Sequence, residues 1–442
     1  MSEAIDFRVP VLGECTVDSP IILSHILGDN LANYVDDEAR VVYTVDVSAS
    51  EREYCVDESE LLQKAGPRER LFFTPARVHA GVVTCGGLCP GLNDVIRALT
   101  RCLWYHYGVR SISGIPFGYH GLLPESTAEV IRLDPDSVDD IHKIGGTCLG
   151  SSRGGGERTG EIVDSLERMG ITMLFCIGGD GTQKGALAIA GEIERRGLQI
   201  AIVGIPKTID NDLSFIQKSF GFETAVSIAS GAVTSAHTEA HSAINGVGLV
   251  KLMGRDSGFI AAHTALACHE ANFVLIPEVP FELDGPNGLL RHLRDRLERS
   301  NHAVIVVAEG AGQDLVSAEG TDASGNRLYG DIGLYLRDRI ARYSRDEGIH
   351  INLKYIDPSY IIRSGVAVPT DSVYCSRLGN NAVHAAMAGK TKVLISLVND
   401  HFVHVPIRCA VGVRNTIDPE SSFWRDVVEA TQQPFLMVND RE

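Results

Sequence analysis

The segment "IPKTIDND" at residues 205–212 places Lys207 and two carboxylates, Asp210 and Asp212, directly after an apolar run. A carboxylate in such a loop can accept a proton from an attacking hydroxyl, and a nearby lysine can neutralise a phosphoryl group in transit. The alternative is that the carboxylate only caps the next helix. The segment is therefore a candidate site of phosphoryl transfer, with Asp210 as general base and Lys207 as its cation.

Two glycine-rich loops, "TCGGLCPGLN" at 84–93 and "CIGGDGTQKGA" at 176–186, also follow apolar runs. Glycines allow the backbone to approach phosphate oxygens closely, and a helix N-terminus adds oriented N–H groups. Neither loop is a Walker A motif, because Gly91 is followed by Leu-Asn. In the second loop Asp180 would repel a phosphate unless Mg²⁺ lay between them, so Asp180 is a candidate metal ligand acting through water. A plain tight turn is the alternative.

Further polar residues follow other apolar runs. Arg255 in "VKLMGRDSG" can bind a phosphate or sugar bidentately, although a surface salt bridge explains it equally well. Glu309 follows "VVA", and the segment "KYIDPSYIIRSG" begins at Lys354. The pair His237 and His241 has the spacing of a zinc site, but no third ligand is evident, and we expect no metal there.

The elements that must position these residues form an alternating pattern. Apolar strand candidates recur at 78–85, 171–178, 199–205, 246–253, 273–277, 303–308 and 392–398. Helical patterns separate them, with one apolar face formed by Leu92, Val95, Ile96, Leu99 and Leu103 and another by Leu289, Leu293 and Leu297. This alternation predicts an α/β fold with parallel sheets, whose ligands bind beyond the carboxyl ends of the strands.

Length and composition limit the function further. A chain of 442 residues predicts two domains and an appendage, and residues 1–77 differ from the rest by an alternating run (Val41, Tyr43, Val45, Val47) and an acidic stretch at 51–60. The net charge of −17 argues against a nucleic-acid partner. No apolar span is long enough to predict a membrane helix, and the cysteines, which form no C-x-x-C pair, are typical of a cytoplasmic protein.

A set of motifs in this order, "GGLCPGLN", "GGDGTQKGA", "PKTIDND", "LMGRDSGFIA", "AEG" and "YIDPSYIIR", resembles the 6-phosphofructokinases and covers the chain from about residue 78 onward. The resemblance implies two Rossmann-like parallel-sheet domains. The nucleotide-binding domain would comprise 78–221, completed by about 362–412. The fructose 6-phosphate-binding domain would comprise 222–361, completed by about 413–442. Residues 1–77 resemble the β-containing extension of the longer plant and trypanosome members.

The resemblance also implies the activity, which is phosphorylation of fructose 6-phosphate at its 1-hydroxyl with Mg²⁺, in glycolysis. Asp210 resembles the family's base, assisted by Lys207 and Arg255. The sugar phosphate would contact Thr208, Ile209, Asp210, Met253, Gly254, Arg255, Glu309, Lys354, Tyr360, Ile361, Ile362 and Arg363. The nucleotide and its metal would contact Gly86, Arg153, Gly154, Gly179, Asp180, Gly181 and Thr182, with Asp180 toward Mg²⁺.

The family usually forms homodimers or homotetramers, and many of its members are allosteric enzymes. In the short bacterial members two arginines reach into the neighbouring subunit's sugar-phosphate site. This chain has Asn245-Gly246 in place of one of them and Lys354 in place of the other. Binding of the 6-phosphate by residues of a neighbouring subunit is therefore expected to differ from that of the short bacterial members.

Two residues bear on the phosphoryl donor. Lys207 is typical of the pyrophosphate enzymes of the family, whereas Gly181 is typical of the ATP enzymes, since pyrophosphate users carry Asp there. An aspartate at 181 would project where the α-phosphate of ATP must lie and would repel it. We therefore expect ATP as the donor. The alternatives are a pyrophosphate-dependent phosphofructokinase, a kinase of the NAD or lipid type that shares only "GGDGT", and a non-catalytic regulatory subunit.

Overall fold

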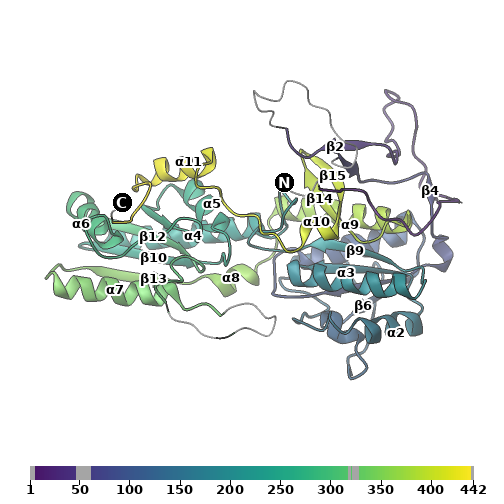
Figure 1. Cartoon of the computed structure of the whole chain (residues 1–442), viewed down its shortest axis with the longest axis horizontal. Helices are drawn as coiled ribbons and strands as arrows, with labels where there is room; N and C mark the ends of the chain where they lie inside the picture. The colour runs from purple at the N-terminus through teal and green to yellow at the C-terminus, as the bar shows by residue number, and fades with distance from the viewer. Residues whose placement is uncertain (1–4, 46–60, 317–319, 321–327, 440–442) are drawn as a thin grey trace. The chain divides into compact units, whose positions relative to one another are not determined.

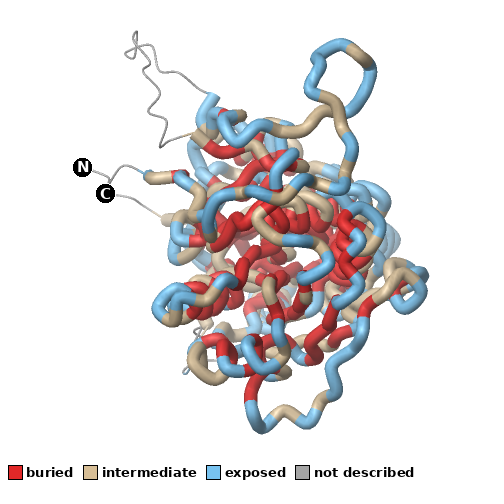
Figure 2. Tube along the Cα trace, turned by 90° about the vertical axis from the view of Figure 1, so that its right-hand side faces the viewer, coloured by how far each residue is buried: buried red, intermediate tan, exposed pale blue. Residues whose placement is uncertain are grey.

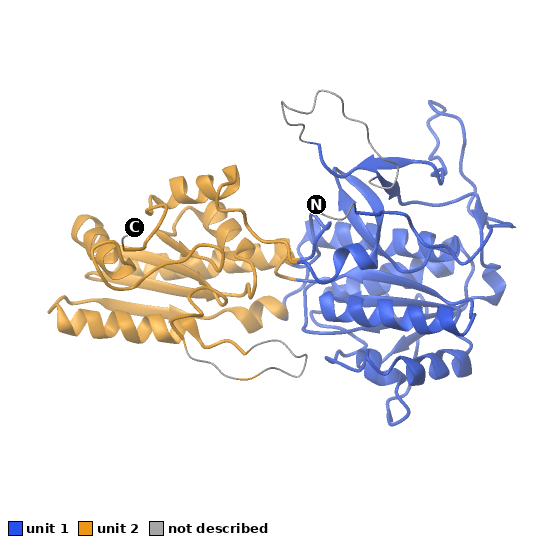
Figure 3. Ribbon diagram, in the orientation of Figure 1, with its two compact units in different colours: residues 1–208, 213–221, 364–413 blue, residues 209–212, 222–363, 414–442 orange. Residues whose placement is uncertain are grey.

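In the computed structural model, which describes residues 5–45, 61–316, 320 and 328–439, the chain divides into two units (Figure 3). Unit 1 comprises residues 1–208, 213–221 and 364–413, and unit 2 comprises 209–212, 222–363 and 414–442. Val47 and the acidic stretch 51–60 lie outside the described residues. The turn 209–212, which we had expected in the nucleotide-binding domain, lies in unit 2 because its backbone oxygens accept hydrogen bonds from Ser257 and Asn415.

The described residues of unit 1 form a nine-stranded sheet in the order β2-β3-β15-β14-β9-β8-β5-β6-β7 (Figure 1). Its central strands β14, β9, β8, β5 and β6 are parallel, and antiparallel strands lie at both edges. The strands are β2 Arg40–Val42, β3 Leu61–Lys64, β5 His79–Thr84, β6 Ser111–Ile115, β7 Ile131–Arg132, β8 Met173–Gly178, β9 Ala201–Pro206, β14 Val393–Val398 and β15 His401–Pro406. A separate small ladder pairs β1 Val17–Asp18 with β4 Arg70–Leu71.

Helices cover this sheet. All residues of β8 and β9 are buried, which requires cover on both faces of a parallel sheet. Helices α2 and α3 pack against each other, as do α1 and α9. The helices of unit 1 are α1 Leu92–Arg101, α2 Thr159–Met169, α3 Asp180–Arg195, α9 Pro369–Met387 and α10 Ile407–Ala410, with single turns η2 Pro75–Arg77, η3 Cys102–His106, η4 Gly118–Leu122 and η5 Ile141–Lys143.

Unit 2 contains a parallel four-stranded sheet in the order β11-β12-β10-β13, formed by β10 Gly246–Leu252, β11 Phe273–Leu275, β12 His302–Ala308 and β13 Asn352–Ile356. Alternate residues of a strand face opposite sides of its sheet. Val250 and Leu252 accordingly join a core cluster with α4, α5 and α11, whereas Val247 and Leu249 join another with α6 and α7. Its helices are α4 Phe222–His241, α5 Phe259–Cys268, α6 Leu289–Ser300, α7 Ile332–Asp346, α8 Ser359–Arg363 and α11 Ser422–Thr431.

The predicted strands and helical faces are confirmed. Each of the seven apolar runs overlaps a strand, and the apolar residues predicted on the two helical faces are buried, although Leu103 lies in η3 just beyond the end of α1. The red segments of Figure 2 show the buried interior as a whole. The alternating run near residue 41 is only partly a strand, because β2 ends at Val42 while Tyr43 packs against the core and Val45 is exposed. No helix among the described residues is long and apolar enough to cross a bilayer.

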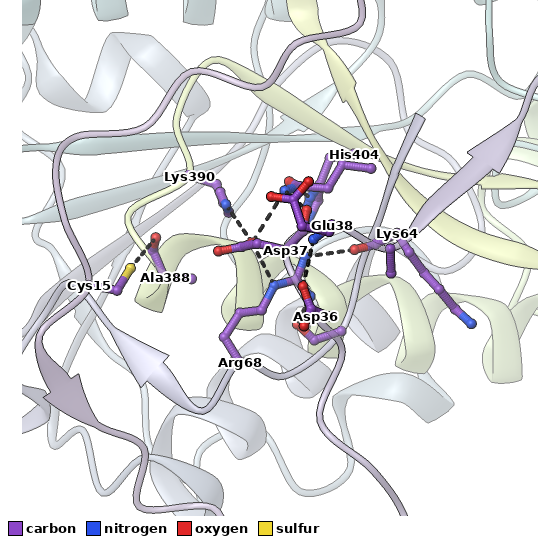
Figure 4. A network of polar contacts seen from close by, with 12 residues as sticks. Cys15, Asp36, Asp37, Glu38, Lys64, Arg68, Ala388, Lys390 and His404 are labelled. Atoms are coloured by element: carbon purple, nitrogen blue, oxygen red, sulfur yellow. Dashed lines mark hydrogen bonds and ion pairs between the residues drawn. The ribbon is translucent and has the colours of Figure 1, made fainter. Parts of the chain in front are cut away.

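A polar network around Asp37 joins the N-terminal segment to the rest of unit 1 (Figure 4). The Asp37 carboxylate accepts hydrogen bonds from Arg68 Nε at 2.9 Å and Lys390 Nζ at 2.8 Å. Gln63 donates to the Asp37 backbone oxygen and binds His404 Nδ1 through its own side-chain oxygen at 2.9 Å. Strands β2 and β3 thereby extend the sheet of unit 1 beyond β15.

Candidate functional site

The two glycine-rich loops and the segment that begins at Lys207 follow three neighbouring strands of unit 1. Strands β5, β8 and β9 are parallel and adjacent, so the loops that follow them begin at one edge of the sheet. These loops begin at Cys85, Gly179 and Lys207. In open α/β sheets this edge is where ligands bind, and it is the edge that the sequence predicted.

The first loop is joined to the segment 150–153 by backbone and hydroxyl hydrogen bonds. Gly86 N donates to Ser152 O at 2.8 Å, and Ser151 Oγ donates to Gly86 O at 2.6 Å. Gly86 has φ of 88°, a left-handed conformation that favours glycine. These contacts place Gly86 beside Arg153 and Gly154, both exposed, so three of the seven residues predicted to hold the nucleotide lie together in unit 1.

The "GGDGT" loop forms the start of helix α3. Gly179 is the N-cap, and Asp180 is the first helical residue, where a helix dipole favours negative charge. The Asp180 carboxylate pairs with Lys184 Nζ at 2.8 Å and accepts a hydrogen bond from Gly412 N at 3.2 Å. Gly181 is exposed, and a Cβ atom added there would meet no heavy atom within 4 Å. The helix N-terminus is therefore open to a ligand at position 181.

Lys207 lies at the end of β9, and its side chain folds onto the first loop. The residue is 7% exposed, and its Nζ donates to Gly87 O at 2.8 Å. A Cβ atom at Gly86 would come within 3.4 Å of the same Nζ. The structure thus brings the Lys207 ammonium to the phosphate-loop candidate, as a role in phosphoryl transfer requires.

In unit 2 the candidate sugar-phosphate residues follow the carboxyl ends of β10 and β12. Gly310 N donates to Gly254 O at 2.9 Å, and Glu309 N donates to Leu252 O at 2.9 Å. A Cβ atom at Gly310 would lie 1.7 Å from Arg255 O, so the two loops touch through backbone that admits no side chain. Arg255 and Glu309 are therefore held next to each other.

Asp210 is the predicted general base, and its carboxylate is buried. Its Oδ1 atom is buried and has no hydrogen-bond partner among the described residues. Burial, and then the charges of Asp212 and Glu309, raise the pKa of Asp210 to about 7, while Arg363 and the Arg255 backbone N–H act in the opposite direction. A base whose pKa lies near the working pH is efficient in proton transfer.

Glu309 and Arg363 complete the polar group around Asp210. Burial raises the pKa of Glu309, and Arg363, Arg255 and Lys251 partly offset that effect. The Arg363 Nε atom lies 3.1 Å from the sulfur of Met253. Unit 2 thus gathers two carboxylates of raised pKa with cationic side chains, which is an arrangement that can bind an anionic sugar and take its hydroxyl proton.

Other predicted residues lie apart from that group or point elsewhere. The Arg255 guanidinium stacks over the Tyr329 ring at 4.7 Å. Tyr360 and Ile361 are 83% and 66% exposed, whereas the side chain of Ile362 is buried in the core of unit 2 and can offer only backbone to a ligand. Lys354 is exposed in the middle of the edge strand β13, and a contact with a sugar phosphate stays a prediction.

Sequence reasoning missed two residues of this site. Arg414 Nη1 binds the Asp212 carboxylate at 2.5 Å, and Glu278 Oε1 accepts hydrogen bonds from Gly258 N at 3.0 Å and Ile417 N at 2.8 Å. Asp212 is 202 residues from Arg414, and Gly258 and Ile417 are 20 and 139 residues from Glu278, so local spacing gave no signal. The sequence signal for Arg414 was only its position after the apolar segment 409–413, and this segment does not form a strand.

The described ranges contain no large cluster of metal-ligating side chains. No group of three or more His, Cys, Asp or Glu residues there is placed to hold a metal ion. His237, His241 and His302 stack ring to ring with centroids 5.0–5.8 Å apart. Mg²⁺ commonly binds proteins through one or two carboxylates together with substrate phosphates, so Asp180 at the N-terminus of α3 fits such an ion.

Comparisons with known proteins show which family this chain resembles. The family model for phosphofructokinase matches residues 79–386. An ATP-dependent 6-phosphofructokinase of Borreliella burgdorferi is 56% identical over 446 residues, which cover 99% of each chain. One from Trypanosoma cruzi is 48% identical over 375 residues, 84% of this chain and 76% of the relative.

Among solved structures, a pyrophosphate-dependent phosphofructokinase from Marinobacter aquaeolei has a TM-score of 0.67 at 21% identity, covering 80% of this chain and 91% of the other. At that identity the likeness supports the fold alone, and it confirms the predicted α/β architecture. The resemblance inferred from the motifs is also confirmed, including its plant and trypanosome branch. With its family's model matched over more than half of its length and relatives this similar along almost all of it, the chain belongs to the phosphofructokinase family.

Proposed function

We propose that this protein is an ATP-dependent 6-phosphofructokinase, which transfers a phosphoryl group from ATP to the 1-hydroxyl of fructose 6-phosphate. The names of its relatives support the activity and the donor. The single structural observation that carries the proposal is the buried, unpartnered Oδ1 of Asp210. A carboxylate oxygen so placed has a free acceptor site for the proton of a substrate hydroxyl.

In this proposal unit 1 binds the nucleotide and unit 2 binds the sugar phosphate. The loops at Gly86 and Gly179–Thr182, with Arg153 and Gly154, hold the ATP phosphates, and Lys207 neutralises the group in transit. Asp180 would hold Mg²⁺, which supplies further charge neutralisation to phosphate oxygens when bound. Arg255, Glu309 and Arg363 orient the sugar phosphate beside Asp210, together with Thr208, Ile209, Met253, Gly254 and the backbone of 360–362.

The proposal also covers the compartment, the assembly and the regulation of the protein. We infer a cytoplasmic enzyme of glycolysis that acts as a homodimer or homotetramer and responds to an allosteric effector. The buried free thiols of Cys85, Cys102 and Cys176 support a reducing compartment. Sedimentation of the purified protein tests the assembly directly.

The donor is tested by an assay with each candidate as sole phosphoryl source. We expect turnover of fructose 6-phosphate with ATP and Mg²⁺ and at most a trace with pyrophosphate, because Gly181 leaves room for the α-phosphate. Turnover with pyrophosphate alone would identify a pyrophosphate-dependent phosphofructokinase, the alternative for which Lys207 is typical. Phosphorylation of NAD in place of the sugar would contradict both.

The variant Gly181→Asp tests the physical argument for ATP. A carboxylate at 181 faces open space, so we expect an unchanged fold and a KM for ATP raised by about tenfold or more, from like-charge repulsion of ~1–3 kcal/mol. Steady-state kinetics with ATP as the varied substrate measures the effect. Gly191→Asp is the matched control, because it lies in the same helix, also in open space, and should leave the KM unchanged. Equal ATP kinetics in the two variants would disprove the glycine argument.

A further inference from the structure

The turn that carries Asp210 also buries a second charge. Asp212 is two residues further on, and its side chain is only 4% exposed. Burying a carboxylate is costly unless a cation and hydrogen bonds compensate for the lost water. Neither the general-base role of Asp210 nor the binding of the sugar phosphate explains why a second aspartate is buried here.

The compensating cation is Arg414, which reaches two loops. Its Nη1 binds Asp212 at 2.5 Å, and its Nε lies 3.7 Å from the carboxylate of Asp256. The adjacent residue Asn415 donates its backbone N–H to Asp212 O at 2.9 Å. The segment at 414–415 therefore holds the Asp212 residue by its backbone and its side chain.

Asp256 connects this pair to the loop that contains Arg255. The Tyr329 hydroxyl donates to Asp256 Oδ1 at 3.1 Å, and the Tyr329 ring lies under the Arg255 guanidinium. In the same loop Ser257 Oγ donates to Asp210 O at 3.1 Å. The turn of Asp210 and the loop of Arg255 are thus joined through Ser257 and through Arg414.

The electrostatic role of Arg414 follows from the groups that face Asp210. These are the carboxylates of Asp212 and Glu309, the guanidinium of Arg363 and the backbone N–H of Arg255. The Asp212 charge makes proton release from Asp210 harder, second only to burial. A cation bound directly to Asp212 offsets that charge, so its removal should make the base harder to ionise.

We propose that Arg414 is a positioning residue for the Asp210 base, which it serves by neutralising Asp212 and by holding the 209–212 turn against the loop of Arg255. This inference rests on the proposed function, because it takes Asp210 to be the base. Arg414 touches neither substrate in this role. Its effect is transmitted through Asp212 and Asp256.

The pH profile of kcat/KM for fructose 6-phosphate distinguishes this role from a merely structural one. In Arg414→Met we expect the acidic limb to move to higher pH by about half a unit to one unit, because Asp212 is no longer neutralised. Arg414→Lys keeps the charge and should return the limb most of the way to the wild-type position. Arg425→Met is the matched control: Arg425 is an exposed arginine of unit 2 that pairs with Asp426 at 2.8 Å, and its removal should leave the profile unchanged.

A second variant keeps the test decisive if Arg414→Met does not fold. Asp212→Asn removes the carboxylate charge and should move the acidic limb to lower pH. In the double variant with Arg414→Met, the limb should not move back to higher pH. An unchanged limb in Arg414→Met or in Asp212→Asn, with Asp210→Ser inactive, would overturn the role of Arg414 and leave the proposed function standing. Full activity of Asp210→Ser would instead overturn the assignment of Asp210 as the base, and a wild-type protein that does not phosphorylate fructose 6-phosphate would overturn the proposed function.

Discussion

Replacing Asp210 with serine should lower turnover of fructose 6-phosphate by ~10²–10⁴-fold, the usual contribution of a general base. Serine is smaller and keeps a hydroxyl, but it cannot take the proton of the 1-hydroxyl at neutral pH. Because Oδ1 of Asp210 has no hydrogen-bond partner among the described residues, the substitution breaks no bond at that atom. We therefore expect the free energy of unfolding to stay the same or rise, since a buried charge is removed.

Three measurements separate this prediction from a loss of folding or binding. Steady-state kinetics gives the fall in kcat, calorimetric titration should show fructose 6-phosphate still bound, and thermal unfolding should show an intact transition. We expect the raised pKa of Asp210 to set the acidic limb of the wild-type pH profile, and this limb should be missing from the residual activity of the variant. Wild-type turnover in the variant would show that another group is the base.

Replacing Asp37 with alanine should strongly destabilise unit 1. Arg68 and Lys390, whose side chains are 5% and 6% exposed, would lose their shared carboxylate and face each other unpaired. Breaking a buried ion pair typically costs ~3–5 kcal/mol, and since Asp37 is itself half-exposed we expect ~2–4 kcal/mol. Denaturant unfolding measures the difference, and Glu38→Ala is the control, as Glu38 is 87% exposed.

The contribution of Asp37 to the free energy of unfolding should depend on pH. Burial opposes ionisation of Asp37, but hydrogen bonds from Lys390 and Arg68 outweigh it and lower the pKa of Asp37 to about 2. A folded-state pKa below the unfolded value of ~3.9 means that the stabilisation is complete above that value and is lost as the pH falls toward 2. The stability gap between the wild type and Asp37→Ala should therefore narrow below pH ~4. A gap that is the same at pH 3 and pH 7 would exclude the ion pair as its source.

The sequence predicted those parts of the site that lie in a loop directly after a strand. Lys207, Asp180 and Arg255 each follow an apolar run, and parallel strands bring the ends of such runs to one edge of a sheet. Asp210 was predicted for the same reason, although its turn belongs to unit 2 rather than to the unit of the strand before it. For these four residues the local sequence pattern was sufficient, because each reactive side chain lies close to the end of a strand.

Contacts between distant parts of the chain could not be predicted in this way. Arg414 and Asp212 are 202 residues apart, and Asp37 and Lys390 are 353 residues apart. The burial of Ile362 within a motif whose neighbours Tyr360 and Ile361 are exposed also depends on how α8 packs, which motif similarity does not reveal. Such facts arise from tertiary packing, for which one sequence contains no direct signal.

The pairing of β3 with β15 has a consequence for how the protein is made. Gln63 of β3 is paired with His404 of β15, which is 341 residues later in the chain. At typical synthesis rates of ~5–20 residues per second, roughly 17–70 s pass between the synthesis of β3 and that of its partner strand. The whole of residues 222–363, with the sheet of unit 2, emerges during that interval. The N-terminal segment, with the apolar side chains of Val41 and Leu62 unburied, must then be kept from pairing with other nascent chains until the last tenth of the protein arrives.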